Sequence, residues 1–274
     1  MIVKLHLKKE IHVPVDAESI SPDVFAGKLV EEIAELPLWK GNRKVPLKDV
    51  FGVEGISGKV TNELVIHIDG NLSKVQRIGS GMTDGEIRIA GDVGMHLGVE
   101  MKGGKITVEG NVGSWLGSSM KGGTIEVNKD AGDYIGAPYR GSTEGMRGGT
   151  ITIHGNAGTE AGRYMKKGLI RIDGDVDQFV GIHLKKGAIL VRGNADGRAG
   201  AFMTGGKIII CGHLKSLLPT FTIDSMKSKA KVEEEIIKEP FYLFIGDLAE
   251  HGSGKLYLAK NKNKHLETHE KLLQ

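Results

Sequence analysis

The sequence is poor in cysteine, aromatic residues and long apolar runs. Cys211 is the one cysteine in 274 residues, which excludes an internal disulfide and a cysteine-based zinc or iron–sulfur site. Aromatic residues make up 5% of the chain, and no run reaches the roughly 18 apolar residues that a membrane span needs. The first residues, MIVKLHLKKEIHV, lack the apolar core and small-residue cleavage site of a secretory signal. We therefore expect a cytoplasmic protein without a membrane span.

Glycine is the residue type in excess. The chain has 41 glycines and 7 prolines, a balance typical of many tight turns rather than of collagen or disorder. The net charge of +3 is small, and no nucleic-acid-binding motif is present. We expect no nucleic-acid partner.

A 19-residue unit recurs through the middle of the chain. Its clearest copy, MKGGKITVEGNVGSWLG, begins at Met101, and a looser first copy covers residues 64–81. One step is lengthened by a seven-residue insertion within APYRGSTEG, residues 137–145, which we expect to loop outward. The copies after the first begin at Met82, Met101, Met120, Met146, Met165, Leu184 and Met203. A fixed period indicates a repeat architecture, in which each unit buries its apolar face against its neighbours.

Each unit contains the alternating pattern I-x-V or I-x-I, which is the period of a β-strand. The unit is too short for a helical pair, and the recurrent leucines of leucine-rich repeats are missing. We therefore predict an all-β fold, a parallel β-helix of about eight coils. The recurring methionines are interpreted as core filler rather than ligands. One inward column consists of Ile87, Ile106, Ile125, Ile151, Ile170, Ile189 and Ile208.

Acidic and amide side chains alternate at another position of the unit. The residues at this position are Asp92, Asn111, Asp130, Asn156, Asp175 and Asn194. The alternation keeps carboxylates from becoming neighbours in the stack, where like charges would repel. We interpret this column as a turn and hydrogen-bond ladder rather than as a metal site.

Two non-repeating ends flank the coils and are expected to cover the open edges of the stack. Residues 1–60 form an N-terminal cap, with a strand in IVKLHL, a helix start at Ser21 and Pro22, and a second helix in LVEEIAEL. Residues 61–213 form the coils. Residues 214–274 form a C-terminal cap and tail, with strands in LPTFTI and EPFYLFIGDL and a hairpin partner in GKLYLA.

The chain carries no recognisable catalytic, cofactor-binding or metal-binding motif. His96, His154 and His183 fall at different phases of the repeat, so stacking does not bring them together. Cys211 occupies an outward strand position and is interpreted as an idle or covered thiol. We assign no catalytic, cofactor or metal residue and expect no cofactor in this chain.

Two features predict a partner interface. The first is a basic stripe after the methionine column, for which the alternative is a solvated turn row with acids nearby. It consists of Lys102, Lys121, Arg147, Lys166 and Lys185. The second is the insertion, where Pro138, Tyr139 and Arg140 are residue types common at interfaces, although an inert bulge is the alternative.

Specific segments resemble a known family. SPDVFAGK, RIGSGMTDGEI and GDYIGAPYRGSTEGMRGGTITIHGNAG are similar to the C subunit of formylmethanofuran dehydrogenase, and the coils also resemble the glycine-rich C-terminal domain of glutamate synthase. The resemblance runs from Pro22 to about Ala259. It implies a right-handed β-helix that acts as a noncatalytic scaffold in an archaeal complex of methanogenesis. That complex reduces CO2 to formate at a tungsto- or molybdopterin subunit.

The same resemblance implies the partners. Formate is condensed with methanofuran at an amidohydrolase-like subunit with a dinuclear metal site, and further partner subunits carry iron–sulfur clusters. Two alternatives stay open: the corresponding subunit of a bacterial formyltransferase/hydrolase complex, and a glutamate-synthase-like module. A secreted carbohydrate-active β-helix enzyme is disfavoured, because the sequence shows neither a secretory signal nor acids clustered in neighbouring coils.

Overall fold

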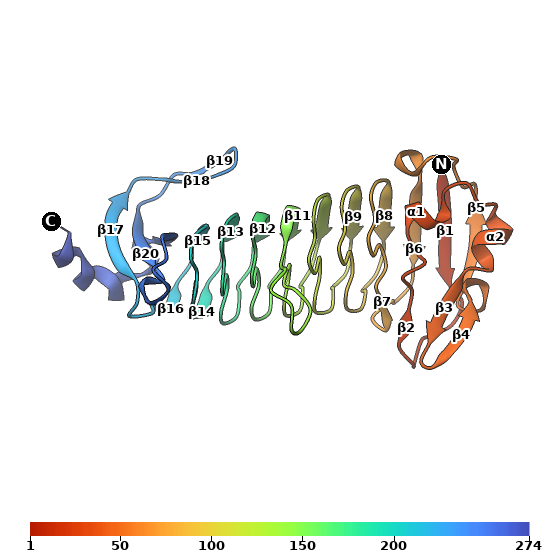
Figure 1. The fold of residues 1–274 in the computed structure, drawn as a ribbon, viewed down its shortest axis with the longest axis horizontal. Helices are drawn as coiled ribbons and strands as arrows, with labels where there is room; N and C mark the ends of the chain where they lie inside the picture. The colour runs from red at the N-terminus through yellow and green to blue at the C-terminus, as the bar shows by residue number, and fades with distance from the viewer. Residues whose placement is uncertain (274) are drawn as a thin grey trace.

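The computed structural model describes residues 1–273. An all-β rod of stacked coils forms the middle of the molecule, with smaller elements at both ends (Figure 1). Its main sheet has 13 strands, in the order β17-β20-β21-β15-β13-β12-β11-β10-β9-β8-β6-β1-β5. The strands supplied by the repeat are β6 (Val65–Asp69), β8 (Glu86–Ile89), β9 (Lys105–Val108), β10 (Thr124–Val127), β11 (Arg147–Ile153), β12 (Lys167–Ile172), β13 (Ala188–Val191) and β15 (Lys207–Ile210).

Each repeat strand pairs in parallel with the strand of the next unit, at the same position of the unit. Ile87 lies opposite Ile106, and Ile125 lies opposite Ile151 across the insertion. The predicted isoleucine column is fully buried along its whole length. A second row of parallel bridges joins the coils on another side, from Leu72 and Val93 onward. That row ends in the short pair β14 (Ala195–Gly197) and β16 (Leu214–Ser216).

The N-terminal end covers the first coil. β1 (Ile2–Leu7) pairs in parallel with β6 and antiparallel with β5 (Phe51–Gly55), so the main sheet continues into the cap. Both predicted helices are present, as α1 (Pro22–Phe25) and α2 (Val30–Ala34). A side sheet, not expected from the sequence, contains β2 (Val15–Asp16), β3 (Pro37–Lys40), β4 (Arg43–Pro46) and β7 (Val75–Gln76). Short 3-10 helices are η1 (Leu47–Asp49) and η2 (Thr61–Glu63).

The C-terminal end closes the stack with strands taken out of chain order. β21 (Gly254–Ala259) pairs in parallel with β15, and β20 (Phe241–Gly246) then pairs antiparallel with β21, as the predicted hairpin requires. β17 (Thr222–Lys227) forms the outer edge and begins later than the predicted strand in LPTFTI. The 3-10 helix η3 (Leu248–Glu250) connects β20 to β21, and the tail after β21 contains η4 (Lys260–Lys262) and η5 (Lys264–Leu272).

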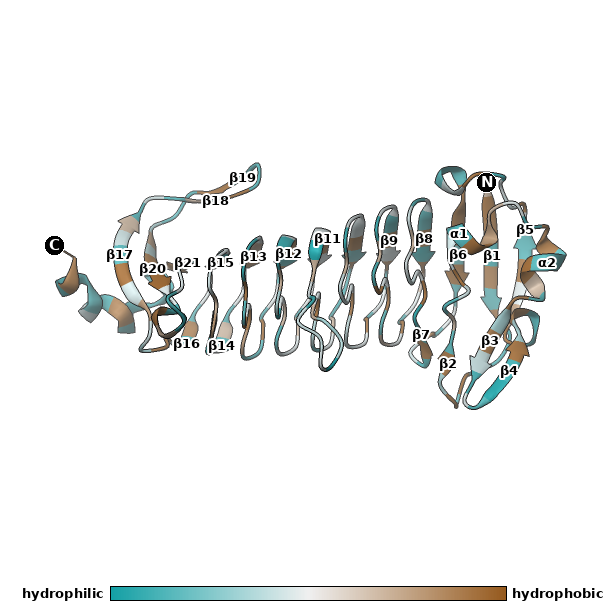
Figure 2. Ribbon diagram, viewed as in Figure 1, coloured by the Kyte–Doolittle hydropathy of each residue, from teal (hydrophilic) through white to brown (hydrophobic). Residues whose placement is uncertain are grey.

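A hairpin arm formed by β18 (Ala230–Val232) and β19 (Glu235–Ile237) reaches back over the outer face of the last coils (Figures 1 and 2). Ala230 and Val232 pack on a small apolar cluster that includes Leu190 and Ile209. The equivalent outward positions of earlier coils are polar, as at Thr107 and Glu126. The outer face of the last coils is apolar at Leu190 and Ile209, because this arm removes these side chains from solvent.

Candidate partner interface

The basic stripe is aligned coil by coil. Each of its residues donates its backbone N–H to the carbonyl oxygen of a methionine in the preceding coil; for Lys121 and Met101 this distance is 2.7 Å. The methionine column itself is fully buried, which confirms its interpretation as core filler. The five stripe positions therefore lie in one row along the edge of the rod.

Acids of the chain itself neutralise much of the stripe. Lys121 lies 2.6 Å from Glu100, and Glu144 contacts both Arg147, at 3.1 Å, and Lys166. The hydrogen bond from Lys121 holds the pKa of Glu100 below its usual range, and the one from Lys166 does the same for Glu144. Lys121, Arg147 and Lys166 therefore fit the alternative interpretation of the stripe, a solvated row of turns with acids nearby.

The remaining two stripe residues, Lys102 and Lys185, are exposed. Neither forms an ion pair with another residue of the 1–273 range that the structure describes. The positive charge that the stripe offers to a partner is therefore concentrated at these two positions.

The insertion does not project freely, contrary to the expectation of an outward loop. Pro138 is buried, whereas Tyr139 is 61% exposed and packs back on the preceding coils. The Tyr139 ring lies 5.8 Å from the ring of His96 and 6.3 Å from that of Trp115. The guanidinium of Arg140 lies 6.0 Å from the Trp115 ring centre. Of the three predicted insertion residues, Tyr139 and Arg140 are the ones with side chains open to a partner.

Beneath the loop lies an aromatic ladder that the sequence interpretation missed. The rings of His96, Trp115 and Tyr134 stack at 5.2 and 4.7 Å, nearly parallel. All three residues have positive φ, near 60°, which is uncommon outside glycine and turns each ring outward at the same corner of successive coils. The 19-residue spacing of His96, Trp115 and Tyr134 is the signal in the sequence that indicates this ladder.

A second ladder occupies a different corner position of later coils. The ring of His183 lies between those of Tyr164, at 4.3 Å, and Phe202, at 5.0 Å. Burial lowers the pKa of both His183 and His96, so both rings favour the neutral form. The prediction that His96, His154 and His183 do not share a line is confirmed, because His96 and His183 belong to separate ladders and His154 lies on the outer sheet face.

Two hollows flank the loop. One of about 500 Å³ lies between the N-terminal cap and the loop and is lined by residues that include Asp16, Arg77, His96 and Tyr139. Another of about 140 Å³ is lined by Trp115, Tyr134, Arg140 and Arg163 among others. We call the set His96, Trp115, Tyr134, Tyr139 and Arg140 the ladder–loop surface. It combines the exposed Tyr139 ring and three half-buried rings with the exposed Arg140, a composition that favours protein contacts.

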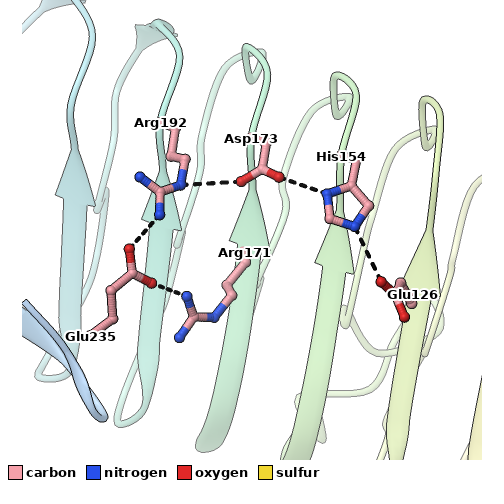
Figure 3. Close-up of polar contacts among 6 residues, drawn as sticks. All are labelled: Glu126, His154, Arg171, Asp173, Arg192 and Glu235. Carbon is pink, nitrogen blue, oxygen red and sulfur yellow. Dashed lines mark hydrogen bonds and ion pairs between the residues drawn. The ribbon is translucent and has the colours of Figure 1, made fainter. Parts of the chain in front are cut away.

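A polar network crosses the outer face and ties the hairpin arm to the coils (Figure 3). His154 lies 2.7 Å from Asp173 and 3.3 Å from Glu126, and these two hydrogen bonds raise its pKa, Asp173 contributing more. Arg192 links Asp173, at 3.3 Å, to Glu235 of the arm. Arg171 also contacts Glu235. The network joins four coils and the arm, which makes its first role structural.

The Asp/Asn column forms the predicted hydrogen-bond ladder. Asn111 donates its backbone N–H to the Asp92 carboxylate at 2.7 Å and its side-chain amide to the same oxygen at 3.0 Å. The Asn111 side-chain oxygen accepts from the Asp130 N–H at 3.2 Å. The same backbone contact continues through Asn156, Asp175 and Asn194.

The Cys211 thiol is held in its protonated form. Burial, with a smaller contribution from Glu239, raises the pKa of the Cys211 thiol to about 12. Cys211 packs beside the apolar cluster under the chain's own arm, so no partner is needed to cover it. In the part of the chain that the structure describes, no three His, Cys, Asp or Glu side chains are grouped to hold a metal ion. Across residues 1–273, none of the helices combines the length and apolarity that crossing a membrane requires.

Comparisons with known proteins bear on this geometry. No family model matches the chain. Over 90 residues, 33% of this chain and 30% of the relative, it is 42% identical to the C subunit of molybdenum-containing formylmethanofuran dehydrogenase 1 of Methanosarcina barkeri. Over 91 residues, 33% of this chain and 34% of the relative, it is 45% identical to the C subunit of tungsten-containing formylmethanofuran dehydrogenase 2 of Methanothermobacter marburgensis. The matched segment thus spans about a third of these curated relatives.

A solved structure extends the likeness to nearly the whole chain. It is a chain of the formyltransferase/hydrolase complex from Methylorubrum extorquens, determined with methylofuran. The TM-score is 0.81 at 28% identity, over 93% of this chain and 99% of that one. The resemblance found in the sequence is therefore confirmed: over about a third of its length this chain is homologous to C subunits of formylmethanofuran dehydrogenase, and nearly the whole chain shares the fold of a chain from a formyltransferase/hydrolase complex.

Proposed function

We propose that the chain is a noncatalytic scaffold subunit of a tungsten- or molybdenum-containing formylmethanofuran dehydrogenase complex in archaeal, cytoplasmic CO2 reduction. The observation that supports this is the structural likeness, over 93% of the chain, to a chain of a formyltransferase/hydrolase complex. The 42% sequence identity over 90 residues to a C subunit of formylmethanofuran dehydrogenase supports it further. The coils at 61–213 are proposed to wind as a right-handed parallel β-helix between caps at 1–60 and 214–274.

In this proposal the chemistry lies in other subunits. The tungsto- or molybdopterin subunit reduces CO2, the amidohydrolase-like subunit with its dinuclear metal site condenses formate with methanofuran, and iron–sulfur clusters belong to further partners. This chain supplies rigidity. Its coils are joined by parallel pairing at every step, so the rod presents partner-binding side chains at fixed spacing.

The ladder–loop surface and the free stripe lysines are the proposed contacts. Tyr139 and Arg140 are large, exposed and held by ring contacts, so little side-chain entropy is lost when they bind a partner. Lys102 and Lys185 add charge along the same rod. Lys121, Arg147 and Lys166 are weaker candidates, because a partner's acid must compete with Glu100 or Glu144.

Co-purification tests the proposal. The tagged full-length chain, expressed in its native source, is expected to bring down partner subunits containing tungsten or molybdenum, measured by elemental analysis. Substituting both Tyr139→Ala and Arg140→Ala is expected to weaken partner association by about tenfold or more, since loss of an interface anchor typically costs over 1 kcal/mol. The control is Lys44→Ala in β4, at the edge of the N-terminal side sheet that lies opposite β7. Catalysis of formyl transfer or CO2 reduction by the isolated chain would refute the noncatalytic role.

The bacterial formyltransferase/hydrolase complex is the second candidate, favoured by the solved structure that the chain resembles over nearly its full length. That alternative predicts partners that transfer and hydrolyse formyl groups without CO2 reduction. Co-purified subunits devoid of tungsten and molybdenum, yet active in formyl transfer, would decide for it.

A further inference from the structure

Several cations on the outer face of the repeat strands are paired with carboxylates. Arg88 lies 2.8 Å from Glu86, and Lys105 lies 3.4 Å from Glu126. Further along, Arg171 and Arg192 share Glu235 of the arm. The chain thus places an acid beside each of these outward cations.

Three lysines at the root of the hairpin arm have no such carboxylate partner among the described residues. Lys207 of β15 and Lys255 of β21 are register partners on adjacent strands. The Lys207 ammonium donates to the backbone oxygen of Lys231 in β18, at 2.7 Å. Within residues 1–273, no carboxylate lies within ion-pair distance of any of the three ammonium groups. Like charges on directly opposed strand positions destabilise a sheet, so the fold retains a repulsion at the Lys207–Lys255 pair.

The groups around Lys207 stabilise its ammonium but add no negative charge that would neutralise the three lysines. Lys207 is half-buried, with its ammonium 5.8 Å from the Tyr257 ring centre. Burial, followed by the charges of Lys255 and Lys231, lowers the pKa of Lys207. Burial, with a smaller contribution from the charge of Asp224 in β17, raises the pKa of Tyr257. Asp224 makes no ion pair with these lysines among the described residues.

We propose that Lys207, Lys231 and Lys255 form a docking site for a carboxylate-rich segment of a partner subunit. The proposal rests on the proposed function, because it requires an assembly. The three lysines form a second contact region, on the outer face at the C-terminal end and separate from the ladder–loop surface. Charge complementarity determines the kind of partner that fits. A partner segment with several carboxylates would give the three lysines the counter-charges that the arginines and Lys105 of this face already have within the chain. Docking also exploits the strand-fixed spacing of Lys207 and Lys255.

Lysine labelling of the free chain and of the purified assembly tests the site without a mutation. Acetic anhydride is applied at pH 7.5 and the modified lysines are quantified by mass spectrometry. In the free chain Lys207 is expected to react faster than other lysines of similar solvent exposure, because its lowered pKa increases the fraction of neutral amine. In the assembly all three lysines are expected to be labelled at least fivefold more slowly, while Lys44 of β4 is unchanged. Equal labelling in the two states would overturn the site.

Charge removal distinguishes electrostatic docking from simple covering. The triple substitution Lys207→Gln, Lys231→Gln and Lys255→Gln is expected to weaken assembly at least tenfold in 0.15 M salt, with a smaller difference in 0.5 M salt. The free variant is expected to be at least as stable as the parent, because a repulsion has been removed. A control triple at Lys9, Lys44 and Lys59 changes the net charge equally on exposed N-terminal positions.

The outcomes separate the two proposals. Protection without any effect of the triple substitution would overturn the charge-based site and leave the scaffold function intact. A parent chain that assembles with no partner subunit would overturn both.

Discussion

Asn111→Asp tests whether the alternation of acids and amides is a requirement of the stack. In the folded chain Asn111 lies between Asp92 and Asp130 in neighbouring coils, and its amide donates to the Asp92 carboxylate at 3.0 Å. The substitution changes almost no volume. It removes that donor and places three carboxylates in consecutive coils, at a strand spacing of about 4.8 Å.

The expected cost follows from two terms. A hydrogen bond from the amide to a carboxylate is worth about 1.5 kcal/mol. Two carboxylates about 4 Å apart repel by about 1 kcal/mol in a water-like dielectric, and two such neighbours are created. We expect the free energy of unfolding to fall by about 3 kcal/mol at low salt. At 1 M salt the repulsion is largely screened, which leaves about half of this loss.

Urea unfolding followed by far-UV circular dichroism measures the effect at 0.05 and 1 M sodium chloride. Asn194→Asp is the matched control, because its neighbours in the column are Asp175 and the backbone of His213. It creates one carboxylate pair instead of two, and we expect about 1 kcal/mol. Equal stability of the Asn111→Asp variant and the parent at low salt, or a loss independent of salt, would refute the electrostatic reasoning.

Three further predictions concern the core, the thiol and the outer-face network. Ile125→Ala, at a fully buried position between two coils, is expected to lower the free energy of unfolding by about 2–5 kcal/mol in the same urea assay; a loss under 1 kcal/mol would contradict the continuous core. Cys211 is expected to resist maleimide at pH 8 in the folded chain and to react within minutes in 6 M urea, because a thiol with a pKa of about 12 is almost wholly protonated; rapid labelling of the folded chain would contradict its burial. His154 has a raised pKa, so its stabilising contribution is fully present below its unfolded pKa of about 6.5 and is lost as the pH rises through the folded value. The urea midpoint is expected to fall less between pH 6 and 8 in His154→Gln than in the parent, and an identical pH profile would count against the network.

Much of the architecture was predictable because it is set by local pattern. Strand pairing between Ile106 and Ile125 follows from a period that places the same residue at the same height of successive coils. The buried methionine column and the Asp/Asn ladder follow for the same reason. The helix at Pro22 was signalled by a capping residue and a proline, which act within one turn of chain.

The candidate interface was less predictable because it depends on which residues meet across the fold. The stripe was found by its spacing, but the acids that neutralise it, Glu100 and Glu144, occupy other phases of the repeat. The ladder–loop surface requires that the insertion fold back onto His96 and Trp115, and no periodic signal specifies the path of an insertion.

The sequence by itself determined the coil, its 19-residue period and the side chains that point inward, because these depend on alternation within a strand and repetition between strands. Only the tertiary structure decided which outward residues remain free. The arm covers Leu190 and Ile209, and acids of the chain form ion pairs with Lys121 and Lys166. The loop leaves Tyr139 exposed and buries Pro138. The physical reason is that exposure and charge pairing arise from contacts between segments distant in the chain, whose positions no local pattern encodes.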